Sequence, residues 1–178
     1  LEHFALLGAY FFKNYNNITL RLNPYDKTGK CFYPKAEFIS EATHSIKLDR
    51  SFEEIFRTWS KGNKSSVSKS KRSEVKVNLA ETANDWKTYY EIYENSLIRW
   101  GDKATSRYEF ELFRLLSGLD KNHVKLWLGE FDGEAVAGAL CLYSNKHAVY
   151  WHGAAKEKYF NLRPVNLILY EAIKDATE

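Results

Sequence analysis

The sequence lacks methionine, and its 178 residues include only three prolines, nine glycines and two cysteines. So little proline and glycine excludes collagen-like and linker-like chains. A chain of this length ordinarily contains several methionines, so their absence and the start at Leu1 predict a fragment of a longer protein. Cys31 and Cys141 lie far apart without metal-ligand spacing, which favours two buried thiols in a reducing, cytoplasmic compartment over a disulfide.

Long hydrophobic runs are missing as well. No stretch approaches the length of a membrane span, which predicts no transmembrane segment. The apolar run 4–12 is short and no basic residue precedes it, so it is a poor signal peptide. Aromatic residues, in contrast, make up 16% of the chain, and they can bury large flat surfaces or stack on a ligand. With 44% hydrophobic and 28% charged residues, the chain is predicted to form one globular domain, or one domain and a small piece of another.

The net charge of +3 is unevenly distributed. Segment 61–76 contains six basic residues and one acid, Glu74, so the rest of the chain is slightly acidic. A charge run is by default a solvated helix face. It can also bind a phosphate-rich substrate or a tRNA backbone, with Lys64, Lys69 and Arg72 as candidate contacts, or touch an anionic membrane. Lysine and serine interleave there without an aromatic residue, which argues against a platform for stacked bases.

The hydrophobic pattern is weak in the first part of the chain. It predicts a helix over 3–15, strands at 18–22 and 45–49, and a turn-rich loop at 23–29. Ser51 and Glu54 have the spacing of a capping box for a helix that runs through Trp59. Residues 61–63 then interrupt the pattern, and 65–71 has helical length but one apolar residue, Val67.

The pattern is clearer from residue 75 onwards. A strand at 75–79 is followed by two amphipathic helices, at 86–100 and 108–119. A three-stranded antiparallel meander comes next, with strands at about 124–131, 135–143 and 147–153. The final helix begins at Pro164 and extends to about 173. Gly101 ends the first of these helices. Asp132-Gly133 is a strong hairpin signal between the first two strands of the meander.

Five fragments in this order resemble one family. They are Trp59–Lys71, Arg99–Lys103, the hairpin Phe131–Leu140, Tyr150–Ala154 and Arg163–Leu167. Together they resemble FemAB-like (FemABX-type) acyltransferases of the GNAT superfamily, over about residues 40–178. The hairpin alone is a common GNAT feature, so the order of the fragments carries the resemblance.

The resemblance implies an α/β (α+β) fold of the GNAT type, with a mixed, mostly antiparallel sheet flanked by helices. Residues 1–50 would be the tail of a first GNAT-like subdomain, and 51–178 a GNAT-like domain truncated at its C-terminal end. It implies an acyl- or aminoacyltransferase that moves an activated acyl group to an amine, on a small-molecule or envelope-precursor acceptor in cell-envelope (peptidoglycan) or polysaccharide biosynthesis. The acyl donor would be aminoacyl-tRNA or an acyl-CoA thioester, with no further cofactor assigned.

The sequence departs from CoA-dependent GNAT enzymes at one informative place. The glycine-rich pyrophosphate loop is absent, and Phe160–Val165 stands in its position. This disfavours acetyl-CoA and agrees with FemABX-type enzymes, which take aminoacyl-tRNA. No zinc-type Cys/His cluster, P-loop, dinucleotide glycine signature or nucleophile elbow is visible in the sequence, and no metal site is predicted.

The candidate site is the third strand of the meander and the helix after it. The N-terminus of that helix suits anionic groups, with Arg163 and Asn166 as donor or phosphate contacts, or as a surface cation and a structural cap. His152 could act as a general base, although packing or hydrogen bonding is the commoner role of such a residue.

Aromatic residues near this strand could bind the acceptor. Trp100, Tyr150 and Trp151 are the candidates, with core packing the alternative for at least one of them. Strand alternation predicts that Tyr150 and His152 share one face of the sheet and that Trp151 lies on the other.

Two functions are therefore open. The first is acyl or aminoacyl transfer, in which positioning and backbone amides that face the carbonyl oxygen supply the catalysis. The alternative is a non-catalytic GNAT-like module that binds an anionic polymer through segment 61–76.

Overall fold

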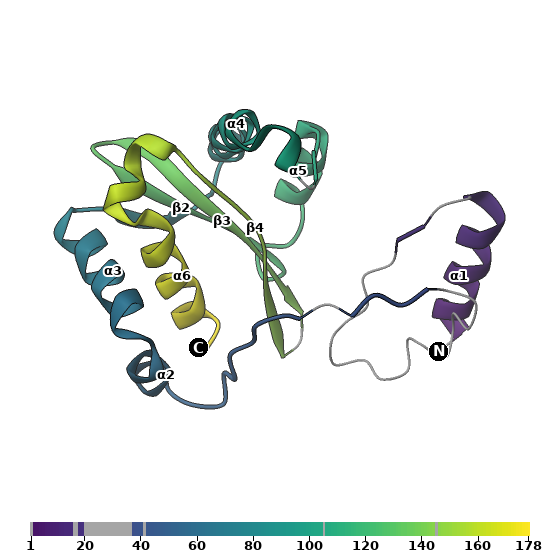
Figure 1. Ribbon diagram of the computed structural model, residues 1–178, viewed down its shortest axis with the longest axis horizontal. Coiled ribbons are helices and arrows are strands. Elements are labelled where there is room, and N and C mark those ends of the chain that lie inside the picture. Colours follow the sequence, from purple (N-terminus) through teal and green to yellow (C-terminus); the bar gives the residue numbers. More distant parts are fainter. Residues whose placement is uncertain (1, 16–17, 20–36, 41, 105, 145) are drawn as a thin grey trace. The chain divides into compact units, whose positions relative to one another are not determined.

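A computed structural model describes residues 2–15, 18–19, 37–40, 42–104, 106–144 and 146–178 (Figure 1). The chain divides into two compact units, Leu1–Ile46 and Lys47–Glu178. Within the first unit, α1 (Glu2–Asn14) confirms the predicted N-terminal helix. The predicted loop 23–29, Cys31 and most of the predicted strand 18–22 lie outside the described residues, and residues 18–19 are not in a strand.

The predicted strand at 45–49 is wrong, because those residues pair with no neighbouring strand in the described part of the chain. An alternating pattern marks a strand only where one of its faces is covered. Ile46, the apolar centre of that pattern, is 48% exposed.

A four-stranded antiparallel sheet forms the centre of the second unit. Its strands are β1 (Lys76–Leu79), β2 (Val124–Phe131), β3 (Glu134–Ser144) and β4 (His147–Ala155), in the spatial order β1-β2-β3-β4. Asp132 and Gly133 both have positive φ in the β2–β3 turn, as the predicted tight hairpin requires. The meander and the first strand confirm the sheet that the sequence predicted.

Helices cover both faces of this sheet (Figure 1). On one face lie α4 (Ala83–Trp100) and α5 (Phe110–Ser117). On the other lie α6 (Pro164–Asp175) and, packed against it, α3 (Lys61–Arg72) and α2 (Phe52–Thr58). Two short 3-10 helices, η2 (Gly101–Lys103) and η3 (Glu157–Leu162), follow α4 and β4.

The core beneath α4 and α5 is aromatic. Tyr89, Tyr93 and Phe113 are fully buried and pack on Leu126 and Leu140 of the sheet. Tyr89 lies so close to Gly138 that a Cβ there would stand 2.7 Å from its Cε2 atom. Glycine is therefore required at this place in β3, because the ring occupies the space of a side chain.

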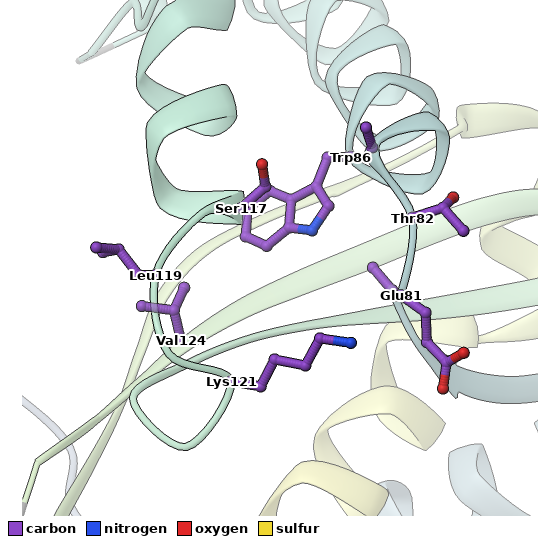
Figure 2. Close-up of a pocket in the computed structure, with 9 residues that line it drawn as sticks. Glu81, Thr82, Trp86, Ser117, Leu119, Lys121 and Val124 are labelled. Carbon is purple, nitrogen blue, oxygen red and sulfur yellow. The ribbon is translucent and has the colours of Figure 1, made fainter.

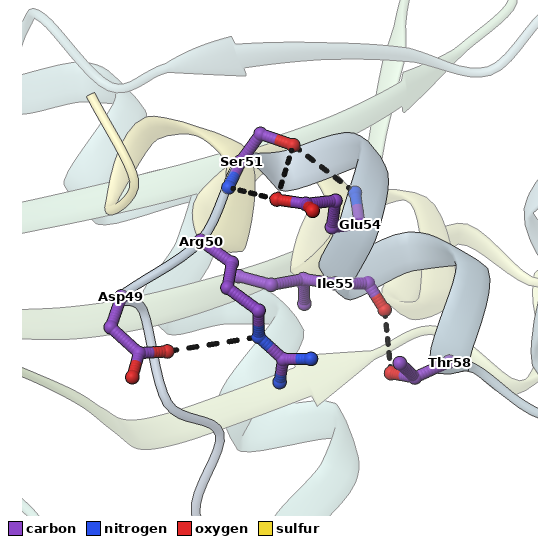
Figure 3. A network of polar contacts seen from close by, with 6 residues as sticks. All are labelled: Asp49, Arg50, Ser51, Glu54, Ile55 and Thr58. Carbon is purple, nitrogen blue, oxygen red and sulfur yellow. Dashed lines mark hydrogen bonds and ion pairs between the residues drawn. The ribbon is translucent and has the colours of Figure 1, made fainter.

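Side-chain caps begin two of the helices, and the one at Ser51 confirms the predicted capping box. The Ser51 hydroxyl accepts from the Glu54 amide at 3.3 Å, and the Glu54 carboxylate accepts from the Ser51 amide at 3.1 Å (Figure 3). This reciprocal pair satisfies amides that the first turn of α2 leaves without a helical partner. Thr82 and Asp85 form the same box at α4, where burial raises and backbone hydrogen bonds lower the pKa of Asp85, with a net lowering.

The predicted interruption at residues 61–63 is wrong, because α3 begins at Lys61 and Gly62 lies inside it. The Ser60 hydroxyl accepts from the Asn63 amide at 3.2 Å and caps the helix. Val67 and Ser70 are buried, and Val67 packs in a cluster that includes Leu167 of α6. Tertiary packing thus stabilises a segment whose own helix propensity is low.

Candidate active site

An extra residue in β4 shapes the candidate site. Cys141 pairs with Tyr150 and Leu140 pairs with His152, so Trp151 has no partner in β3. Such a bulge shifts the alternation of side chains by one residue. Because Leu140 belongs to the core beneath α4 and Cys141 to the core beneath α6, His152 and Tyr150 lie on opposite faces. The prediction that they share a face is therefore wrong.

His152 lies inside the aromatic core. Its Nδ1 atom is 2.6 Å from the Tyr89 hydroxyl oxygen. Five aromatic rings surround the imidazole at centroid distances of 4.5 to 5.9 Å: Tyr89, Tyr93, Tyr108, Phe113 and Trp151. Burial lowers the pKa of His152 to about 4, and burial raises the pKa of Tyr89. The imidazole is therefore neutral near pH 7 and a weak proton acceptor, held by a phenol that stays protonated.

The two other aromatic residues of β4 have different surroundings. Trp151 packs against Tyr108 at 5.2 Å between ring centroids and is partly buried beside the core. Tyr150 is 49% exposed, and its ring extends over Gly153, where a Cβ would stand 2.8 Å from the Tyr150 Cζ atom. Burial of its hydroxyl raises the pKa of Tyr150. Tyr150 thus presents a partly exposed, protonated phenol next to the bulge.

Arg99 is a candidate site residue that the sequence did not single out. Its Nη1 atom donates to the Ala155 carbonyl at 3.2 Å, and its Nη2 atom lies 3.4 Å from the Ser96 hydroxyl. The guanidinium stands 4.8 Å from the centre of the Phe160 ring and 5.7 Å from that of Trp100. Within the described part of the chain it forms no ion pair with a carboxylate.

The Arg99 guanidinium is partly buried, lies between two exposed rings and has no counter-ion among the described residues. It is therefore suited to bind an anionic group. Trp100, which the sequence proposed for substrate binding, lies beside it and is 37% exposed. The Arg99-Trp100 pair was visible in the sequence as part of a family-like fragment. Its contacts were not, because Ala155 is 56 residues away.

The N-terminus of α6 begins at an unusual residue. Arg163 has a left-handed backbone conformation (φ 59°, ψ 39°), its side chain makes no cap, and Pro164 follows at the first helical position. A positive φ at a residue other than glycine is uncommon and is often found at functional positions. The Asn166 amide donates to the Arg163 carbonyl at 3.1 Å. Arg163 is exposed and Asn166 half-buried, so both predicted residues stand at this helix start.

The predicted phosphate contacts on α3 fall into two groups. The Lys64 ammonium donates to the Arg57 carbonyl at 2.6 Å and thereby caps the end of α2. Lys69 and Arg72 are exposed and share the outer face of the helix with Lys61. Lys71 instead lies 4.0 Å above the Tyr170 ring. The structure therefore separates Lys64 from the other two predicted contacts.

Comparison with known proteins places this fold in a family. The family described as "Acetyltransferase (GNAT) domain" matches residues 55–178. The chain therefore belongs to the GNAT acetyltransferase family. The comparison with curated proteins found no match.

A solved structure supports the same fold. A crystal structure of FemX superposes with a TM-score of 0.64 at 14% sequence identity, over 73% of this chain and 48% of FemX. The chain thus spans about half the length of FemX, and at this identity the likeness concerns the fold, which agrees with the predicted FemABX-like GNAT architecture. An aminoglycoside acetyltransferase from an uncultured soil metagenomic sample, in complex with sisomicin, superposes with a TM-score of 0.45 at 13% identity, over 58% of this chain and 70% of that one.

Proposed function

We propose that this chain is an N-acyl- or aminoacyltransferase that moves an activated acyl group to the amine of an anionic acceptor. The observation that carries the proposal is the bulge in β4, which leaves Trp151 without a partner residue in β3, on a strand that α6 contacts. Free backbone amides at fixed positions can stabilise the oxyanion that forms when an amine attacks an ester or thioester. The family assignment supplies the reaction class.

The side chains around the bulge are given roles by their surroundings. Arg99 would bind an anionic group of the acceptor, and Trp100 would cover it. Tyr150 would line the acyl group, while Arg163 and Asn166 at the start of α6 would bind the phosphates of the donor. His152 would hold the strand through Tyr89. Amine acylation then depends on positioning, and the amine must arrive neutral.

The donor we favour is aminoacyl-tRNA, with an acyl-CoA thioester as the competing donor. Arg163 and Pro164 stand where a CoA-binding loop would have glycines, and Pro164 is buried and offers no amide. An acceptor in envelope biosynthesis fits an anionic, amine-bearing precursor. The compartment we propose is the cytoplasm, where buried thiols such as Cys141 stay reduced.

The test is acyl transfer by the purified protein with two donors, acetyl-CoA and alanyl-tRNA, and with an anionic peptidyl amine as acceptor. Arg99→Ala and Arg163→Ala should each lower kcat/KM at least about tenfold, since each loses a charge-assisted contact. Lys158→Ala, an exposed residue of η3, is the matched control and should leave kcat/KM within about twofold. If neither donor is consumed, or if the two arginine variants match the control, the proposal fails.

A second candidate function is binding of an anionic polymer without catalysis. The favouring observation is the outer face of α3, where Lys61, Lys69 and Arg72 are all exposed. We do not include Lys64 among the contacts with the polymer, because its ammonium donates to a carbonyl of α2. Since this surface belongs to α3 and not to β4, polymer binding and acyl transfer are separable by mutation.

A further inference from the structure

A small pocket lies at the other edge of the sheet from β4 (Figure 2). Its volume is about 160 Å³, and it is formed where β1 ends, α4 begins, α5 ends and β2 begins. Trp86, which is 6% exposed, and Val124, which is 7% exposed, form its buried wall, and Ala80, Ala83 and Leu119 complete the apolar part of the lining nearer the surface. The proposed acyl-transfer function uses none of these residues.

The mouth of the pocket carries one charge of each sign. Glu81 and Lys121 both line it and both are exposed. In Figure 2 the Lys121 side chain extends toward the segment that carries Glu81. Among the residues that the structure describes, neither charge forms an ion pair, and they do not pair with each other. Two opposite charges thus flank one cavity of mixed polar and apolar lining and remain open to a ligand.

The hydroxyl groups of the lining are already engaged. The Ser117 hydroxyl donates to the Arg114 carbonyl at 2.7 Å. The Thr82 hydroxyl accepts from the Asp85 amide at 3.2 Å, and the Asp85 carboxylate accepts from the Glu81 and Thr82 amides. The charged groups available to a polar ligand are therefore the Glu81 carboxylate and the Lys121 ammonium, beside the indole N–H of Trp86.

From this arrangement we infer that the pocket binds a free α-amino acid with a small apolar side chain. The ammonium of the ligand pairs with Glu81, its carboxylate pairs with Lys121, and its side chain packs against Trp86 and Val124. The size is suitable, because an engineered apolar cavity of about 150 Å³ holds a benzene molecule. A single charge would select an amine or an acid, whereas two opposite charges at one mouth select a zwitterion.

The inference is tested by calorimetric titration of the full chain with three probes of similar shape. L-valine carries both charges, isobutylamine lacks the carboxylate, and 3-methylbutanoate lacks the ammonium. L-valine should bind at least about fivefold more tightly than either single-charge probe, since each exposed ion pair adds a modest factor. The indole N–H resonance of Trp86 should shift on addition of L-valine, and those of the other tryptophans should stay in place.

Four variants locate the site. Glu81→Gln and Lys121→Gln should each weaken L-valine binding about threefold or more. Glu81→Gln should leave binding of 3-methylbutanoate unchanged, because that probe has no ammonium. Lys121→Gln should leave binding of isobutylamine unchanged, because that probe has no carboxylate. Ala83→Leu, at an exposed position of the lining, should fill the pocket and abolish binding. Lys87→Gln, on an exposed face of α4, is the charge-matched control.

Three results would overturn the inference: no heat with L-valine, equal affinity for the three probes, or L-valine binding that survives Ala83→Leu. None of these depends on acyl transfer, so the pocket and the proposed function can fail separately.

Discussion

At the scale of single residues, contacts between α4 and the sheet decide the geometry near the bulge. Tyr89 needs the space above Gly138, and it reaches His152 from there. His152 in turn is confined by aromatic rings, which is why the pKa of its imidazole is low. Substitutions at these positions should therefore change stability in ways that their contacts predict.

Gly138→Ala should destabilise the protein by about 1–3 kcal/mol, because the new methyl group would overlap the Tyr89 ring in a closely packed core. Urea unfolding followed by circular dichroism measures the change. Gly62→Ala is the matched control, since its nearest neighbour is the Ser60 hydroxyl at 3.9 Å and alanine is the better helix former. It should stabilise by up to about 1 kcal/mol, and equal effects at the two glycines would contradict the packing argument.

Stability should fall as the pH drops from about 6.5 toward about 4, in part because of His152. The folded state holds the imidazole neutral, while the unfolded chain protonates it near its ordinary pKa of 6.5, so acid favours unfolding. Its contribution is therefore present above pH 6.5 and lost as the pH falls through the folded pKa.

The measurement compares His152→Gln with the parent chain. Carboxylates also titrate in acid, so the difference between the two proteins isolates the imidazole. Between about pH 6 and 5 the parent should lose up to about 1.4 kcal/mol per pH unit more than the variant. Parallel stability curves would show that His152 is not the group that titrates.

At the scale of elements, α6 is held to the sheet by a polar contact as well as by its apolar face. The Lys125 ammonium of β2 donates to both oxygens of Asp175 at 2.7 and 2.6 Å. The same ammonium lies 4.8 Å from the centre of the Tyr143 ring. The contact fixes the last turn of the helix whose first turn carries Arg163 and Asn166.

Asp175→Asn should cost about 1–3 kcal/mol, because the two side chains of this pair are only 21% and 26% exposed and the lysine would be left partly buried without its partner. The Arg114–Glu111 pair is the control, since both of its side chains are more than half exposed. Glu111→Gln should therefore cost much less than Asp175→Asn. Thermal and urea unfolding measure both changes, and a double-mutant cycle with Lys125→Met separates the pair from its surroundings.

At the scale of the whole molecule, exposed positive charge is concentrated on the helix α3. The chain carries +3 overall, and the outer face of α3 presents Lys61, Lys69 and Arg72 in one row. None of the described helices is long and apolar enough to cross a membrane. Electrostatic attraction to an anionic polymer is the interaction that such a face supports.

Binding of polyuridylate to the chain should weaken steeply with salt. Replacing Lys61, Lys69 and Arg72 by Gln should reduce the slope of log K against log salt by about 2, near 0.7 for each cation lost. Fluorescence anisotropy over a salt series measures the slope. A control in which exposed Lys87, Lys103 and Lys146 become Gln removes the same charge elsewhere and should retain the slope. Equal slopes for the two triple variants would count against a docking role for α3.

Much of the fold was predictable because its signals are local. The Ser51–Glu54 cap, the Asp132-Gly133 turn and the amphipathic α4 each lie within a short stretch of sequence, and the structure confirms them. The order of helices and strands from residue 75 followed from such stretches. The failures, at 45–49 and at Gly62, are places where neighbours distant in sequence decide the outcome.

The candidate active site was likewise predictable only in those parts that depend on local sequence. Composition and spacing were enough to predict most of its elements, the aromatic richness of the core and the basic character of α3. Three features emerged only from packing in three dimensions: Trp151 is the extra residue of β4, Arg99 reaches Ala155, and Lys64 is held by α2. Strand register and side-chain partners are set by contacts between segments, and one shifted residue moves a side chain to the opposite face, so no local pattern could reveal them.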